Sequence, residues 1–291
     1  MLSEVYKMIR VTGSDAGKFL QGQLTQDMKR LAQIGTLPAA WCNPQGRVIS
    51  LLRILITDDG YGLVLPASVA ETVCKRLIVY RLRANINIEV ASSDWTCLVF
   101  NTDADMNQLE KLDLKPQQKI NACRIDHGLI AVNIGIEEQC VELMGFYANM
   151  EKIGIEAAQH TKPNFLRVAK IRAGIPECLS RQSENYTPHM LNLDLLGAVS
   201  FDKGCYTGQE VVARTQFLGN SKRRLMRYRI GETVAACGDK ISYEQRNVGE
   251  VINVSEDNLL AVTPVALHDK TLLIAGVKII PAPLPYSIPG S

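Results

Sequence analysis

Residues Phe201–Arg214 read F-D-K-G-C-Y-T-G-Q-E-V-V-A-R, and this stretch places a thiol, an amine, a carboxamide and a carboxylate within eight residues. Gly204 and Gly208 flank Cys205 and its neighbour, and glycine allows a tight turn without a Cβ clash. The segment Thr207–Glu210, T-G-Q-E, precedes an apolar run and matches a capping box. The pattern therefore predicts that a turn carries the cysteine and that a helix begins at Gly208.

The predicted turn is a favourable place for chemistry. Free N–H groups at a helix N-terminus attract anions, and Lys203 adds a formal positive charge beside them. From this setting we expect the thiolate form of Cys205 to be favoured, which makes this residue a candidate reactive thiol. Two plainer interpretations remain, because free cysteines are often buried as small apolar side chains and Glu210 can serve only as a helix cap.

Further motifs occur in a fixed order along the chain. They are F-L-Q-G-Q-L-T-Q-D at 19–27, W-C-N-P-Q-G-R at 41–47, R-A-G-I-P at 172–176, N-L-D-L-L-G-A-V-S-F at 192–201, K-G-C-Y-T-G-Q-E at 203–210, L-G-N-S-K-R-R at 218–224 and P-L-P-Y-S at 283–287. Together they resemble the YgfZ family of folate-binding proteins, which are relatives of the glycine-cleavage T-protein. The resemblance extends over nearly the whole chain, and the cysteine motif is its most specific part.

The resemblance implies an α+β, GcvT-like folate-binding fold of three parts around a central channel, with a small C-terminal β-barrel. It implies that the channel holds tetrahydrofolate or a derivative and that Cys205 faces it. The residues that the resemblance assigns to folate are Tyr6, Lys203, Gln209, Glu210 and Arg214. It also implies a role in the assembly or repair of iron–sulfur clusters, which supports tRNA modification indirectly through cluster enzymes that thiolate tRNA.

Several positions depart from the T-protein pattern. Cys205 stands where the T-protein has an acidic residue, and Ser50 and Leu51 are the residues available where its catalytic aspartate is expected. Arg172 replaces a folate-contacting glutamate, and Leu166 replaces an aromatic residue. Neither Ser50 nor Leu51 can supply general base catalysis as a carboxylate does. We therefore expect an accessory protein, and the first alternative is a folate-dependent one-carbon transfer enzyme of the aminomethyltransferase type.

The domain organisation follows from length and pattern. A chain of 291 residues exceeds the size at which one core usually suffices. After Arg224 the sequence changes to short β-rich runs separated by turn residues, which predicts a small β-barrel or sandwich. We expect residues 1–224 to form the folate-binding α+β region, with a middle subdomain at about 90–160. Residues 225–291 are expected to form the C-terminal β-barrel domain.

Local patterns predict individual elements in the first region. Asp58, Asp59 and Gly60 predict a hairpin that joins strands at 48–56 and 61–65. Helical spacing predicts further elements at 14–33 with a break at Gly22, at 68–82, at 103–112, from Met144 to near Gly154, and from Asn164 to a stop at Gly174. Helices and strands mix without strict alternation, which favours an α+β fold over a doubly wound sheet.

The net charge is only +2, so no strong overall field draws the chain to nucleic acid or to a membrane. Basic clusters at 75–83 and 222–229 leave a direct tRNA-binding module as a second alternative. Charged residues on sheet edges also discourage aggregation, which is a plainer reason for the second cluster. We therefore do not expect direct nucleic-acid binding, and the partners implied are a folate and iron–sulfur client or assembly proteins.

The cellular setting is predicted from targeting signals and cysteines. The N-terminus lacks an apolar signal-peptide core, and no stretch is long and apolar enough to span a bilayer. Eight cysteines are scattered without a C-x-x-C pair, which argues against a disulfide framework and a self-contained zinc site. We expect a cytoplasmic protein with reduced thiols, no metal site and no contact with membranes.

Overall fold

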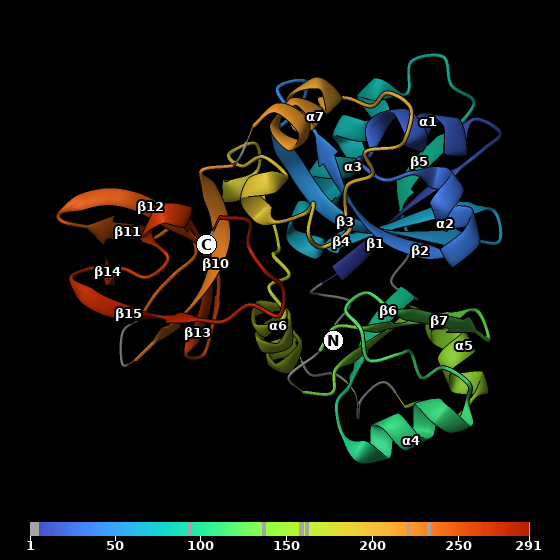
Figure 1. The fold of residues 1–291 in the computed structure, drawn as a ribbon. Coiled ribbons are helices and arrows are strands. Elements are labelled where there is room, and N and C mark those ends of the chain that lie inside the picture. Colours follow the sequence, from blue (N-terminus) through green and yellow to red (C-terminus); the bar gives the residue numbers. More distant parts are fainter. Residues whose placement is uncertain are drawn as a thin grey trace.

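The computed structural model describes residues 6–91, 95–135, 138–156, 160, 163–219, 221–231 and 234–290. Its strands form a five-stranded sheet, a four-stranded sheet and a closed barrel, with helices packed around the two sheets. Figure 1 shows these as three parts, with the barrel beside the other two. The mixed α+β fold and the C-terminal barrel that the sequence predicts are therefore confirmed.

The first part is an antiparallel sheet in the order β2-β3-β4-β1-β5. Its strands are β1 (Tyr6–Thr12), β2 (Thr36–Cys42), β3 (Val48–Thr57), β4 (Gly60–Pro66) and β5 (Asn87–Val90), and its helices are α1 (Ala16–Gln23), α2 (Met28–Ile34) and α3 (Ala67–Tyr80). The hairpin predicted at residues 58–60 is confirmed, because β3 and β4 pair antiparallel on either side of it. The break in the first helical segment lies at residues 24–27, a few residues after Gly22.

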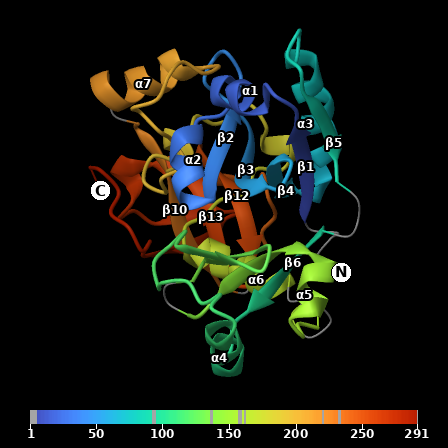
Figure 2. The same cartoon turned by 90° about the vertical axis from the view of Figure 1, so that its right-hand side faces the viewer.

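Strand alternation gives this sheet two buried faces. In β1, Ile9 and Val11 pack in a core with the helices, whereas Tyr6 and Met8 pack in a second core with the middle part of the chain. One face of the sheet therefore packs against the helices, and the other face directs side chains toward the middle part of the chain. Figure 2 shows the helices α1 and α3 on the side of this sheet remote from β6.

The second part is a four-stranded antiparallel sheet in the order β6-β9-β8-β7. Its elements are β6 (Trp95–Phe100), α4 (Asp103–Lys111), β7 (Cys123–Asp126), β8 (Leu129–Asn133), β9 (Val141–Phe146) and α5 (Tyr147–Lys152). The helix α4 begins with a capping box between Thr102 and Asp105. The helix expected from Met144 was placed too early, because Met144 pairs with Ile130 in the sheet and α5 begins only at Tyr147.

A connecting segment joins the two sheets to the barrel. It contains α6 (Pro163–Arg172) and two short 3-10 helices, η3 (Ser180–Gln182) and η4 (His189–Leu191). Gly174 follows α6 with φ of 67°, a left-handed conformation that ends a helix, as the sequence predicts. The segment then returns to the first sheet, where the Glu184 N–H donates to the Val48 carbonyl oxygen and the Val48 N–H donates to that of Tyr186.

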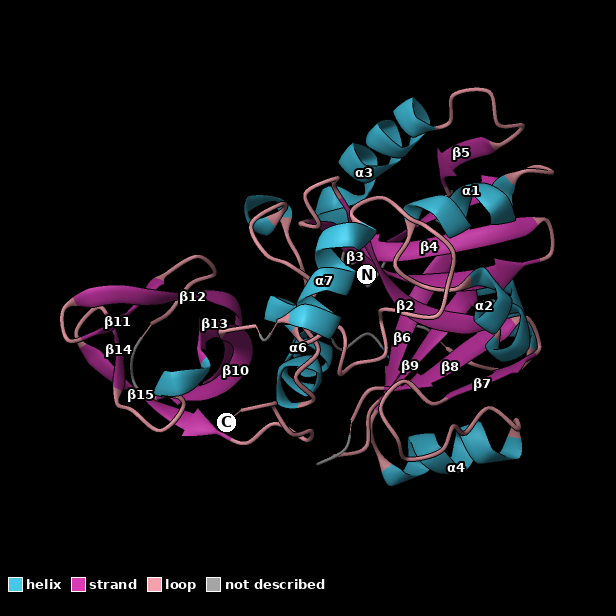
Figure 3. Cartoon of the chain, turned by 45° about the horizontal axis from the view of Figure 1, so that its top comes forward, coloured by secondary structure: helices cyan, strands magenta, loops and turns pink. Residues whose placement is uncertain are grey.

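The third part is a closed barrel in the order β10-β13-β12-β11-β14-β15. Its elements are β10 (Arg223–Ile230), β11 (Lys240–Tyr243), β12 (Arg246–Ser255), β13 (Asn258–Pro264), the 3-10 helix η5 (Val265–Leu267), β14 (Leu272–Ile274) and β15 (Val277–Ala282). The last β-rich run of the sequence proves to be two strands, because Ala275 and Gly276 adopt positive φ and reverse the chain. Figure 3 shows the barrel in cross-section, beside α6 and the connecting segment.

Candidate functional site

The cysteine motif forms a turn and helix α7 (Gln209–Leu218), but the predicted capping box is wrong. Gly208 is the N-cap residue with φ of 82°, and no side chain caps the helix there. The Gln209 side-chain oxygen instead accepts the Tyr206 N–H at 3.2 Å. A left-handed backbone at Gly208 cannot present the geometry that a threonine cap requires. The Thr207 N–H donates to the Gly22 carbonyl oxygen, which seats the turn on the first part.

The ammonium group of Lys203 is bound inside the protein. It donates to carbonyl oxygens at the end of α1 and beyond it, at 2.6 Å to Gln21, 2.7 Å to Leu24 and 2.8 Å to Gln26. It also lies 4.9 Å from the ring centroid of Tyr206. Desolvation lowers the pKa of Lys203 to about 8. Only the charged amine has enough N–H groups for all three carbonyls, so Lys203 fastens the cysteine motif to the first part.

The other members of the motif face outward. Cys205 is an exposed free thiol, and Glu210 and Arg214 are exposed on α7. Tyr206 and Val212 are the buried side chains that anchor the segment. Figure 1 shows α7 on the outside of the first part, away from the four-stranded sheet. The motif is therefore a surface feature held from beneath by Lys203 and Tyr206.

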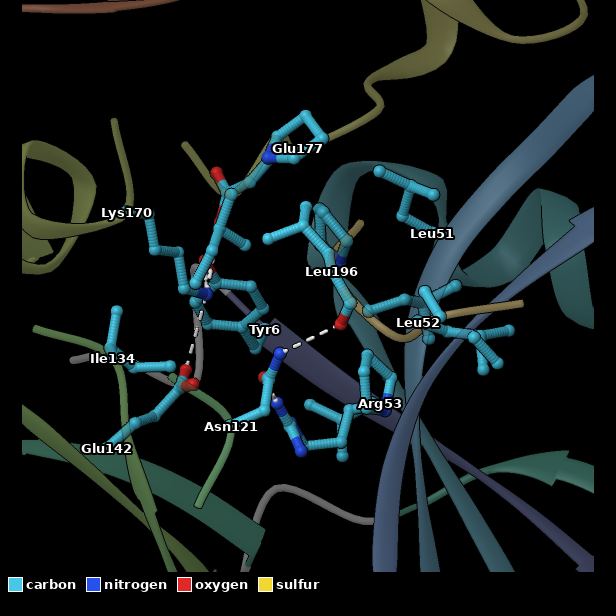
Figure 4. A pocket seen from close by; sticks show the side chains of 18 of the residues that line it. Tyr6, Leu51, Leu52, Arg53, Asn121, Ile134, Glu142, Lys170, Glu177 and Leu196 are labelled. Carbon is cyan, nitrogen blue, oxygen red and sulfur yellow. Dashed lines mark hydrogen bonds and ion pairs between the residues drawn. The ribbon is translucent and has the colours of Figure 1, made fainter. Parts of the chain in front are cut away.

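A cavity with largely apolar walls lies elsewhere, between the first sheet, the second sheet and the connecting segment. Its volume is about 100 Å³, and apolar side chains such as Leu51, Leu52 and Leu196 line much of it. Figure 4 shows these side chains together with polar groups that point into the same space. The polar members of the wall come from separate elements and are Tyr6, Arg53, Asn121, Glu142, Lys170 and Glu177.

One end of the cavity holds a cluster of buried ionisable groups. Lys170 Nζ lies 2.6 Å from the Tyr6 hydroxyl, 3.3 Å from Glu177 Oε1 and 3.4 Å from Glu142 Oε1. The Tyr6 hydroxyl donates to Glu177, and the Cys97 thiol donates to Glu142 at 3.2 Å. Burial raises the pKa of Glu177 to about 7. The cluster therefore contains a carboxyl group, that of Glu177, whose charge changes near neutral pH.

A guanidinium and an amide form a second polar region of the cavity wall. Arg53 lies on β3, and it donates to the side-chain oxygen of Asn121 and to the Thr36 hydroxyl at 3.4 Å. Asn121 is itself held by its side-chain amide, which donates to the Leu196 carbonyl oxygen at 3.3 Å. Figure 4 shows Arg53 and Asn121 on the opposite side of the cavity from Glu142 and Lys170. The cavity thus combines hydrogen-bond donors with acceptors.

The structure separates the residues that the sequence assigns to one site. Tyr6 lines the cavity, whereas Cys205, Lys203, Gln209, Glu210 and Arg214 are absent from its described wall. Leu51, one of the two residues that the resemblance sets against the T-protein aspartate, does line the cavity with its apolar side chain. Away from the cavity wall, Ser50 and Leu166 are buried and Arg172 is paired with Glu138 at 2.9 Å.

Sequence patterns did not identify the remaining polar residues of the cavity. Three of them nevertheless carried a weak signal. Arg53 and Glu142 are single charges inside apolar strands, and Lys170 is a single charge inside the buried part of α6. A charge at a buried position requires a partner or a function. Glu177 directly follows the R-A-G-I-P motif and is held by the barrel, because Asn253 bonds both its N–H and its carbonyl oxygen.

The basic clusters prove to be partly internal. In the cluster at 222–229, Arg224 is buried against Asp194 at 2.7 Å and Arg229 pairs with Asp257 at 2.7 Å. In the cluster at 75–83, Arg76 pairs with Glu184 at 2.6 Å. These cations are therefore not a uniform surface for phosphate groups. Within the described ranges, no helix combines the length and the apolar character needed to cross a membrane.

Comparison with known proteins finds relatives of this chain in sequence and in fold. No protein-family model matches the chain. The chain is similar to proteins named tRNA-modifying protein YgfZ. That of Colwellia psychrerythraea is 26% identical over 270 residues, which is 86% of this chain and 82% of the relative. That of Hamiltonella defensa is 27% identical over 275 residues, or 90% and 81% of the two chains. That of Escherichia coli is 29% identical over 234 residues, or 77% and 70%.

Among solved structures, the fold is similar to the glycine cleavage system aminomethyltransferase T of Bartonella henselae. The two superpose with a TM-score of 0.70 over 98% of this chain and 84% of that one, at 18% sequence identity. This likeness concerns the fold alone. The chain is therefore similar in sequence to YgfZ proteins over most of its length, and it shares the fold of a glycine-cleavage aminomethyltransferase.

Proposed function

We propose that the protein is a folate-binding accessory factor for the assembly or repair of iron–sulfur clusters, and that it supports tRNA modification indirectly. The observation that carries the proposal is the cavity between the three chain segments, where the buried Glu142, the half-buried Glu177 and Arg53, and apolar walls meet. Ligand sites in proteins typically combine such apolar walls with a few fixed polar groups. The YgfZ names of the relatives support the link to tRNA modification.

The donor and acceptor set of the cavity suits the ring system of a folate. A pterin ring carries N–H groups on one edge, and Glu142 and Glu177 offer acceptors for them. The flat faces of the ring would contact leucine side chains such as Leu51 and Leu196, which line the wall. We propose tetrahydrofolate or a derivative as the ligand, with Tyr6 as a wall residue. The ring would bind in the cavity by apolar contact with the leucine side chains and by hydrogen bonds to the glutamate carboxylates.

An accessory role fits the cavity better than aminomethyl transfer does. Leu51 lines the wall near the position where the T-protein has its carboxylate, and a leucine cannot act as a general base. The ionisable groups that are present already hold one another, because Lys170 is paired with both Glu142 and Glu177. Such a network fixes and polarises a bound ligand without itself providing a nucleophile.

We propose that Cys205 acts at the surface rather than in the cavity. Its thiol is exposed and lies on the segment that Lys203 fastens to the first part. An exposed thiol can meet the cluster or the thiol of another protein, which a group inside the cavity cannot. We further propose a cytoplasmic location, which the absence of disulfides among the eight described cysteines supports.

The folate proposal is tested by anaerobic calorimetric titration with tetrahydrofolate. Saturable binding to the wild-type protein is expected, with affinity reduced about 10-fold or more by Glu142→Gln, because a hydrogen bond to a charged group is lost. Glu138→Gln is the matched control, since Glu138 belongs to the same part of the chain but pairs with Arg172. Absence of saturable heat from the wild-type protein would overturn the proposal.

The role of the thiol is tested separately. Cys205→Ser should leave folding and tetrahydrofolate affinity unchanged, because the side chain is exposed and outside the cavity wall. It should abolish support of a cluster-dependent tRNA-thiolating enzyme in cells, whereas Cys237→Ser, a change of a thiol in the third part of the chain, should not. Full support by the Cys205→Ser protein would show that the thiol has no essential role.

A further inference from the structure

Arg53 is a charged side chain of the cavity wall without an acidic partner. Within the described part of the chain its hydrogen bonds go to the side-chain oxygens of Asn121 and Thr36, and no ion pair is found for it. Burial lowers the pKa of Arg53, and Glu142 acts in the opposite direction from across the cavity. Buried cations are normally paired with carboxylates, since an unpaired one loses its hydration without compensation.

The partners of Arg53 hold its position without neutralising its charge. Asn121 has φ of 62°, a left-handed conformation that asparagine tolerates better than most residues, and its amide is fixed to the Leu196 carbonyl oxygen. Its side-chain oxygen therefore points at Arg53. A guanidinium has more N–H groups than these two acceptors occupy. The remaining donors are available to an oxygen acceptor inside the cavity.

Acceptors and donors thus face the same small space from different strands. Glu142 on β9 offers carboxylate oxygens, while Arg53 on β3 offers N–H groups. In a folate ring the ring oxygen stands next to the ring N–H and the exocyclic amine, so one edge carries an acceptor beside donors. A site that supplies both donors and acceptors binds an analogue weakly if a ring donor is replaced by an acceptor, or an acceptor by a donor. A buried polar group of the protein is then left without a hydrogen-bond partner.

We infer that Arg53, positioned by Asn121, recognises the ring oxygen of the folate and makes the cavity selective for the oxo form over the amino form of the ring. This inference rests on the proposed folate function. It adds a specificity residue that acts on the ring rather than on the glutamate tail. The proposed hydrogen bond from Arg53 to the ring oxygen does not depend on where the carboxylates of the glutamate tail lie.

The test compares folic acid with aminopterin, in which an amine replaces the ring oxygen, the adjacent ring nitrogen loses its hydrogen and the tail is the same. Both are titrated at about pH 8, above the pKa of about 7 that burial gives Glu177, so that this carboxyl group is mostly ionised. The wild-type protein is expected to bind folic acid about 10- to 100-fold more tightly than aminopterin. Arg53→Met should reduce this preference by weakening folic acid more than aminopterin.

A second variant tests the same contact in case Arg53→Met does not fold. Asn121→Asp keeps the size and the backbone tolerance of residue 121 but gives Arg53 a carboxylate partner, which competes with the ring oxygen. It should also reduce the preference for folic acid. Arg30→Met changes an exposed arginine of α2 and is the matched control, which should bind like the wild-type protein.

The outcomes separate the inference from the function on which it rests. If the wild-type protein binds neither compound, the folate proposal itself fails. If it binds both equally and Arg53→Met changes nothing, the folate site stands and the role of Arg53 is wrong. Equal losses for folic acid and aminopterin in Arg53→Met would also overturn the inference, because they would assign Arg53 to the carboxylates of the tail.

Discussion

Lys203 Nζ lies 2.6 Å from the carbonyl oxygen of Gln21, so the amine of the cysteine motif is hydrogen-bonded to the end of α1. Lys203→Met keeps much of the apolar stem but leaves three carbonyl oxygens without their donor. We expect a loss of about 2–3 kcal/mol in the free energy of unfolding. Urea denaturation measures it, with the exposed Lys29→Met as control. Unchanged stability would show that water replaces the ammonium group without loss.

The two glycines of the motif should differ sharply. Gly208 has φ of 82°, and a Cβ there would lie 2.3 Å from the Asn43 carbonyl oxygen, whereas a Cβ on Gly204 meets nothing within 4 Å. Gly208→Ala should therefore lower the free energy of unfolding by about 2 kcal/mol or more, because strain and a backbone clash combine. Gly204→Ala should leave it unchanged. Equal effects of the two changes in thermal unfolding would contradict the placement of the turn.

Glu177 should give the stability a pH dependence of known sign. Burial raises its pKa from 4.5 to about 7, so the folded state holds the proton more tightly than the unfolded state does. The resulting stabilisation is complete below about pH 4.5 and is lost as the pH rises through about 7, by at most about 3 kcal/mol. In urea denaturation between these pH values, Glu177→Gln should flatten the decline. A wild-type profile that rises over this range would exclude the assignment.

The barrel should depend on one buried ion pair. Arg224 binds both oxygens of Asp194, at 2.7 and 3.0 Å, and also donates to the His189 carbonyl oxygen at 3.0 Å. Asp194→Asn leaves the buried guanidinium uncompensated, so we expect a loss of about 3–5 kcal/mol. Asp257→Asn breaks the more exposed pair with Arg229 and should cost at most about 1 kcal/mol. Similar midpoints of unfolding for the two variants would refute this difference.

Sequence patterns predict those parts of the fold that depend on neighbouring residues. The hairpin at Asp58–Gly60 and the stop of α6 at Gly174 follow from backbone preferences of a few residues, and both are present. The capping box at Thr207 failed because Gly208 is held in a left-handed turn against the Asn43 carbonyl oxygen, a contact between distant segments. Local propensity cannot anticipate such a contact.

The cavity was less predictable for the same reason. Arg53, Asn121 and Glu142 come from separate strands and turns, and no spacing in the chain relates them. The sequence motif led us to expect the ligand site at Cys205, whereas the thiol of this residue lies at the surface. Only Tyr6, among the residues that the sequence proposed for the ligand, lies in the cavity wall. A single charge within an apolar strand is the signal that deserved more weight.

The bond from Tyr6 to Glu177 links residues 171 positions apart. During synthesis Tyr6 leaves the ribosome about 10 to 30 s before Glu177, at the usual rate of chain elongation. Throughout that interval Tyr6 on β1 lacks the Glu177 carboxylate and the rest of the connecting segment as partners. The cavity wall therefore cannot be complete until Ala198, its last residue along the chain, has been synthesised, and a nascent chain that stalls earlier lacks the proposed site through which a ligand could stabilise it.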